Sequence, residues 1–182
     1  MYSKILYRKY RYDSSFVFNL AIFSSLQNFL ETQEHPQGRI LGLDVGDSYV
    51  GIALSDSHQI IASPLSLYKR ISFQKDAGHL VGIIEKEKIC IVLMGLPYNL
   101  DGSIGSQGKK TLLFAEKITH FLTIPIVFWD ERFSTQAVEK MMISFDTSRK
   151  KREALVDKLS ATYILQGALD YLKLALTNSS GR

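Results

Sequence analysis

The chain has 182 residues, 46% hydrophobic and 22% charged, which suits one globular domain with a substantial core and excludes an intrinsically disordered chain. Its 22 lysines and arginines against 18 acidic residues give a net charge of +4, which favours a polyanionic partner only weakly. The single cysteine, Cys90, excludes an intramolecular disulfide and a cysteine-based zinc site, and it fits a reducing cytoplasm.

The first 38 residues differ in character from the rest. A basic stretch precedes a mostly apolar one at 16–30, which is too short and too polar to span a bilayer. We expect an amphipathic helix there, followed by a linker at 36–38. The chain then divides into an N-terminal extension (1–38), one domain (39–176) and a C-terminal tail (177–182). We expect the extension to be dispensable for activity.

Two apolar runs at 40–45 and 49–55 flank Gly46-Asp47-Ser48, a pattern typical of a β-hairpin with a short turn. Asp44 stands inside the first run, where an ionised carboxylate is costly to bury unless its charge is compensated. A metal ion is one such partner. An acid that caps a glycine turn is the competing interpretation, and this stretch alone supports the two about equally.

The later elements follow from periodicity. A third strand is expected at 59–68, where Pro64 favours an edge position. Uninterrupted apolar runs at 89–94 and 125–129 are typical of parallel strands covered on both faces. Helical spacing predicts helices at 73–88, 106–122, 135–145 and 148–176. The order predicts an α/β fold whose five-stranded mixed sheet carries helices on both faces.

A second candidate acid, Glu131, follows the last strand within Asp130-Glu131-Arg132. Ligands of open α/β sheets gather beyond the carboxyl ends of the parallel strands. If the first strand is central and parallel to the last two, Asp44 and Glu131 share one rim of the sheet. A solvated loop with a local ion pair is the competing interpretation, and for this tripeptide alone it is the stronger one.

The third candidate acid is Asp157, which begins the apolar stripe of the last predicted helix. It lies nine residues after Ser148, the expected N-cap, so a favourable interaction with the helix dipole does not explain it. Three inward carboxylates from distant segments suit a pair of Mg²⁺ or Mn²⁺ ions. Such a pair could activate a water and stabilise the leaving oxygen of a phosphodiester.

The same helix opens with four basic residues, Arg149, Lys150, Lys151 and Arg152. Cations at a helix N-terminus oppose its dipole, and a nearby phosphate backbone would reverse that disadvantage. A solvated run of charge is equally compatible with the pattern. The closeness to Asp157 favours contact with a nucleic acid.

Four segments of the chain, within residues 39–172, together resemble the YqgF family, also called RuvX, of Holliday junction resolvase-like or pre-16S ribosomal RNA nucleases. They are Gly42-Leu-Asp-Val-Gly46 with Gly51, Gly95-Leu-Pro97 with Asp101-Gly102, Asp130-Glu-Arg-Phe-Ser-Thr135, and Lys151 through Asp157 to Ile164-Leu-Gln166. The resemblance implies a ribonuclease H-like fold and metal-dependent cleavage of nucleic acid. It also implies that Asp44, Glu131 and Asp157 are the metal ligands and catalytic residues.

The substrate that the resemblance implies is precursor 16S ribosomal RNA, in the maturation of its 5′ end, with Arg132 and the basic run at 149–152 on the nucleic acid. A Holliday junction resolvase for branched DNA and a non-catalytic RNA-binding factor stay open, as does a homodimer. A sugar kinase or actin-like ATPase is disfavoured by length. Tyr49 stands where the family usually has a basic residue, so one phosphate contact is missing, and Ser160 replaces a common alanine.

Overall fold

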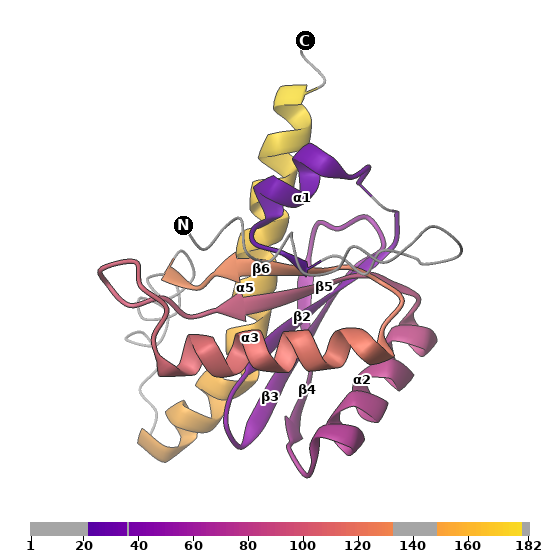
Figure 1. Cartoon of the computed structure of the whole chain (residues 1–182). Coiled ribbons are helices and arrows are strands. Elements are labelled where there is room, and N and C mark those ends of the chain that lie inside the picture. Colours follow the sequence, from indigo (N-terminus) through magenta and orange to yellow (C-terminus); the bar gives the residue numbers. More distant parts are fainter. Residues whose placement is uncertain (1–21, 36, 133–148, 180–182) are drawn as a thin grey trace.

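In this computed structural model of the chain, the described residues are 22–35, 37–132 and 149–179, of which 149–158 and 178–179 are described as backbone only. They form a mixed sheet in the order β1-β6-β5-β2-β3-β4, with helices on both faces (Figure 1). The strands are β1 (Ile22–Phe23), β2 (Arg39–Val45), β3 (Tyr49–Ser55), β4 (Ala62–Lys69), β5 (Ile89–Leu96) and β6 (Ile126–Asp130). The helices are α1 (Leu26–Thr32), α2 (Phe73–Glu87), α3 (Ser106–Ile118), the short 3₁₀ helix η1 (Thr119–Phe121) and α5 (Arg149–Ser179).

The strand directions agree with the predicted mixed sheet. Strands β2, β5 and β6 are mutually parallel, while β3 and β4 continue from β2 as antiparallel neighbours. The central position of β2 and the edge position of β4, which contains Pro64, are both confirmed. The hairpin turn between β2 and β3 is closed by the backbone N–H of Gly46, which donates to the carbonyl of Tyr49 at 2.9 Å.

The prediction of five strands was wrong, because the sheet has six. The additional strand, β1, pairs in parallel with the outer side of β6, with Ile22 opposite Ile126 and Phe23 opposite Val127. A strand of two residues is too short to show alternation in the sequence, and its pairing depends on tertiary packing. Three predicted helix bounds also move. Helix α1 begins at Leu26, α3 ends at Ile118 and is followed by η1, and α5 continues to Ser179, into the predicted tail. The predicted helix at 135–145 lies outside the described residues.

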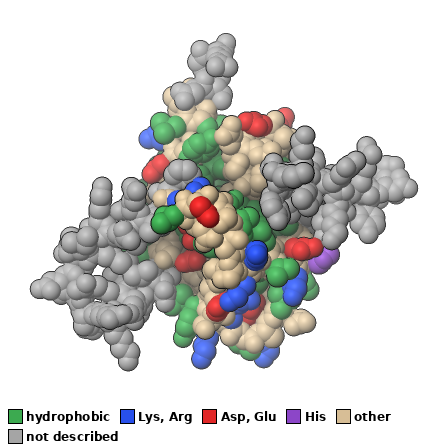
Figure 2. Space-filling view, turned by 60° about the vertical axis from the view of Figure 1, so that its left-hand side comes forward, with side chains coloured by type: hydrophobic (Ala, Val, Ile, Leu, Met, Phe, Trp, Pro, Cys, Tyr) green, Lys and Arg blue, Asp and Glu red, His purple; other side chains and the backbone are tan. Residues whose placement is uncertain are grey.

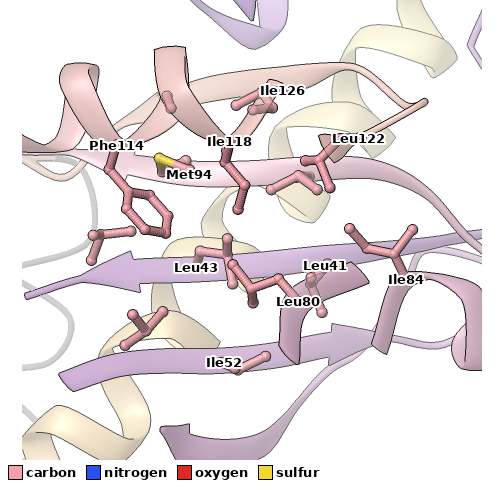
Figure 3. Packing of buried hydrophobic residues seen from close by; sticks show 14 of the residues in the cluster. Leu41, Leu43, Ile52, Leu80, Ile84, Met94, Phe114, Ile118, Leu122 and Ile126 are labelled. Atoms are coloured by element: carbon pink, nitrogen blue, oxygen red, sulfur yellow. The ribbon is translucent and has the colours of Figure 1, made fainter. Parts of the chain in front are cut away.

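Helices α2 and α3 cover one face of the sheet and enclose the larger part of the core. Figure 3 shows apolar side chains from β2, β3 and β5 pointing toward those of the two helices. Helix α2 starts at Ser72, whose hydroxyl accepts from the backbone N–H of Lys75, and it ends at Lys88 in the left-handed conformation, with φ of 53°. This layer holds β2 and β5 rigidly from one side.

Helix α5 crosses the other face directly over β2. A Cβ atom at Gly42 would lie 2.8 Å from Cβ of Leu165 and 3.1 Å from the carbonyl oxygen of Ala161, so only glycine permits this approach. Gln166 ties the same helix to the sheet edge, because its side chain accepts from the backbone N–H of Ala62 at 2.8 Å and donates to the carbonyl of Ile60 at 3.1 Å. The axial position of α5 on the sheet is therefore fixed.

The segment at 22–35 packs on the same face as α5 (Figure 1). Phe23, Leu26 and Phe29 are each 2% exposed and belong to the cluster that contains Trp129 and Leu172. The division of the chain at residue 38 stays a prediction, but part of the predicted extension contributes side chains to the core. Among the described helices, none combines the length and the apolarity needed to cross a membrane.

Candidate functional site

The carboxyl ends of β2, β5 and β6 meet at one rim of the sheet, at the left of Figure 1. Asp44 is the last but one residue of β2, and Glu131 directly follows β6. The backbone N–H of Glu131 donates to the carbonyl of Leu96 at the end of β5, at 3.4 Å. The structure therefore brings the first two candidate acids to the same rim, as the sequence predicted.

The carboxylate of Glu131 turns back over the sheet instead of pointing into solvent. It occupies the space directly above Gly95, where a Cβ atom would collide with Oε1 of Glu131 and lie 2.7 Å from Cδ1 of Ile164. Gly95 is thus required by the path of this acid. The local interpretation of Asp130-Glu131-Arg132 as a purely solvated loop does not account for this inward carboxylate.

The electrostatic environment of Glu131 is unfavourable for its charged form. Burial, together with the negative charges of Asp44 and Asp130, raises the pKa of its carboxyl from 4.5 to about 7. A cation between these carboxylates would stabilise the charged form and lower the pKa again. The carboxylates of this site therefore favour the binding of a cation.

Asp44 is half-buried at the side of a pocket of about 290 Å³ beside the hairpin turn. The lining residues are Asp44, Gly46, Asp47, Ser48, Tyr49, Gly51 and Leu67. Three side chains from other elements hold the turn that forms its end. They are Arg70, which donates to the carbonyl of Gly46 at 2.9 Å, Gln107, which donates to that of Val45 at 2.9 Å, and Lys110, which pairs with Asp47 at 2.7 Å.

Behind this turn lies a buried ion pair that sequence reasoning missed. Asp76, 2% exposed in the first turn of α2, accepts from Nε of Arg70 at 3.1 Å and from the backbone N–H of Ile71 at 3.0 Å. The guanidinium of Arg70 also lies over the ring of Phe114, 5.0 Å from its centroid. The signal in the sequence was that an acid, Asp76, lies on the apolar stripe of the helix predicted at 73–88.

Arg132 forms the local ion pair that the competing interpretation expected. Its Nη2 lies 2.6 Å from Oδ2 of Asp130, and its guanidinium lies over the ring of Tyr98, 5.2 Å from the centroid. Burial raises the pKa of the Tyr98 hydroxyl, as does the charge of Asp130. The side chain of Arg132 stays 43% exposed, so its predicted contact with nucleic acid stays a prediction.

The remaining predicted site residues lie on α5, where only the backbone is described. Asp157 is one helical turn before Ala161, whose carbonyl packs against Gly42, and the basic residues 149–152 form the first turn of the helix. Their side chains lie outside the described residues. Figure 2 shows, over the lower half of its view, basic side chains interspersed with acidic ones, so the described part of this face carries mixed charge.

Comparison with known proteins places this fold and site in a family. A model of the family described as "RuvX: Holliday junction resolvase" matches residues 38–171. A curated relative from Desulforamulus reducens, named "Putative pre-16S rRNA nuclease", is 47% identical over 132 residues, which cover 72% of this chain and 96% of the relative. A relative of the same name from Ruegeria pomeroyi is 43% identical over 138 residues, 76% of this chain and 90% of its own.

The fold also resembles that of a solved resolvase. The structure "T. thermophilus RuvC in complex with Holliday junction substrate" matches with a TM-score of 0.51 at 13% identity, over 76% of this chain and 96% of that one. At this identity the likeness concerns the fold alone, which is ribonuclease H-like. Because the family model spans most of the chain and the relatives are aligned almost end to end, this protein is a member of the RuvX family.

Proposed function

We propose that this RuvX-family protein is a metal-dependent nuclease that hydrolyses phosphodiester bonds, with precursor 16S ribosomal RNA as its substrate and the cytoplasm as its place of action. One observation carries the proposal more than any other. The carboxylate of Glu131 is folded back over Gly95 into a half-buried position near Asp44, at the carboxyl ends of the parallel strands. Two neighbouring acids in such a place favour the binding of a cation between them.

The donor set fits a hard divalent ion. Carboxylate oxygens without histidine or cysteine are the ligands that Mg²⁺ and Mn²⁺ prefer. Asp44 and Glu131 would hold the metal, and Asp157 would supply a third carboxylate from α5. Among the described residues, no group of three acidic, histidine or cysteine side chains is gathered. The proposed third ligand, Asp157, lies one helical turn before the contact of α5 with Gly42, which supports this assignment.

Different residues of the chain would have different roles in the reaction. A divalent metal held by these carboxylates would, when bound, activate a water and stabilise the leaving oxygen. Asp44 and Glu131 would provide the carboxylates from the ends of β2 and β6, beside a hairpin turn that is held by Arg70, Gln107 and Lys110. Arg132 and the basic residues 149–152 would hold the phosphate backbone, because the rest of the described face has mixed charge.

The substrate is the finer part of the proposal. The names of the curated relatives favour precursor 16S ribosomal RNA and its 5′-end maturation. The description of the family and the fold of the RuvC complex favour branched DNA as the second candidate. A non-catalytic RNA-binding role would not account for the inward position of Glu131.

The test compares both substrates under the same conditions. The purified full chain is incubated with precursor 16S ribosomal RNA and with a four-way DNA junction, each with Mg²⁺, with Mn²⁺ and with a chelator. Asp44→Asn should abolish cleavage, whereas the matched control Asp170→Asn should keep it, because Asp170 is exposed on α5, well beyond the contact of that helix with Gly42. Cleavage of the junction alone would transfer the assignment to DNA, and cleavage that survives the chelator would refute the metal mechanism.

A further inference from the structure

Two rows of residues cross the strands β2, β3 and β4 beside the candidate site. In the first row Asp44 lies opposite Gly51, which lies opposite Leu67. In the next row toward the turn, Tyr49 lies opposite Lys69. Because directly opposed residues of antiparallel strands project from the same face and alternate residues share a face, Asp44, Leu67, Tyr49 and Lys69 project from one face of the sheet.

The described residues leave the second row partly exposed. Tyr49 lines the pocket next to Asp44 and is 41% exposed, and among the described residues no other aromatic ring contacts its ring. Lys69 is exposed and forms no ion pair within the described part of the chain. The two rows lie about 7 Å apart along the strands, so a single extended strand of nucleic acid can reach both.

A lysine on an edge strand also discourages pairing with other strands, and β4 is an edge strand. That role explains Lys69 by itself. It does not explain an aromatic ring directly opposite the lysine, partly exposed in the wall of a pocket that also contains a candidate catalytic carboxylate. A ring and a cation side by side are what a nucleotide needs, one for its base and one for its phosphate.

We propose that Tyr49 and Lys69 form a subsite for one unpaired nucleotide of the substrate strand, with the ring stacked on the base and the ammonium group on a phosphate. The subsite rests on the proposed nuclease function and specifies its substrate further. A base can stack on an exposed ring only when it has left its own duplex stack. The enzyme therefore holds single-stranded nucleic acid beside Asp44, in preference to a continuous duplex.

The experiment measures binding without cleavage, so that its result does not depend on catalysis. Fluorescence anisotropy gives the affinity of the full chain for a short single-stranded RNA and for the corresponding duplex, in a chelator and over a range of salt concentrations. Tyr49→Ala should weaken binding of the single strand about tenfold, whereas Tyr49→Phe, which keeps the ring, should bind like the wild type. Binding of the duplex should not respond to either change.

Lys69 is tested through the dependence of affinity on salt. Lys69→Gln should reduce the slope of log K against log salt by about 0.7, the value for one phosphate contact of a single strand, and Lys69→Arg should restore it. Lys173→Gln, an exposed lysine far along α5, is the matched control and should leave the slope unchanged. Circular dichroism and thermal melts check that each variant is folded.

The outcomes separate the subsite from the nuclease. Single-strand affinity unaffected by Tyr49→Ala, an equal loss on the duplex, or no measurable single-strand binding by the wild type would each overturn the subsite. If the wild type binds through Tyr49 but cuts nothing with Mg²⁺ or Mn²⁺, the subsite stands and the nuclease proposal fails. If it cuts while Tyr49→Ala leaves both affinity and KM unchanged, the nuclease stands and the subsite fails.

Discussion

Replacing Phe29 with alanine tests whether the segment before residue 38 belongs to the fold. The ring is 2% exposed and packs edge-on against that of Phe23, with 4.9 Å between centroids, inside the cluster that includes Trp129. Removing a buried phenylalanine side chain typically costs about 3–5 kcal/mol. We take the lower end, about 3 kcal/mol, because Phe29 lies on a short peripheral helix whose surroundings can relax.

A loss of this size is a large part of the roughly 5–15 kcal/mol that stabilises a typical domain. With a urea dependence of about 2 kcal/mol per molar, the midpoint of urea unfolding should fall by about 1.5 M. Leu113→Ala is the matched control, since Leu113 is 54% exposed on α3 and its truncation should change stability by less than about 0.5 kcal/mol. Equal midpoints for the two variants would refute the reasoning and return the segment to a dispensable extension.

Four further predictions concern the candidate site. In a chelator, the free energy of unfolding should fall as pH rises from about 4.5 to about 7, because the pKa of Glu131 is raised in the folded state. Over this range the folded state still holds the proton that the unfolded state has released. Glu131→Gln should flatten this fall, measured by urea titrations at several pH values. The double variant Asp44→Asn with Glu131→Gln should be little less active than either single variant, and multiplicative losses in kcat would contradict a joint metal site. Reversing Lys150 and Lys151 to glutamate should weaken binding of nucleic acid and flatten its salt dependence, and an unchanged slope would make them a solvated run. Gly95→Ala should displace the Glu131 carboxylate and lower Mn²⁺ affinity, measured by calorimetry at a temperature where thermal melts show the variant to be folded.

The larger elements could be predicted because their signals are local. The uninterrupted apolar run at 89–94 lies inside β5, and the glycine turn at 46–48 lies between β2 and β3. The shared rim of Asp44 and Glu131 also followed from sequence, because parallel strands put their carboxyl ends together. These features need only composition, periodicity and a general rule of topology.

The missed features depend on tertiary contacts that no local pattern carries. The direction of the Glu131 carboxylate is set by the absence of a side chain at Gly95, on a neighbouring strand. The pairing of Arg70 with Asp76 joins the end of a strand to the first turn of the following helix and serves a turn 24 residues earlier in the chain. The pairing of Tyr49 with Lys69 appears only when the register of β3 and β4 is known.

Strand β1 has a consequence for the colloidal behaviour of the protein. Without it, β6 would end the sheet with an apolar stretch, Ile126 to Trp129, whose backbone groups could template the addition of another chain. A two-residue strand covers part of that border and is itself too short to recruit a further one. At the other border, Pro64 lacks a backbone N–H to offer. Loss of the pairing between β1 and β6 would therefore expose this border of the sheet to pairing with strands of other chains.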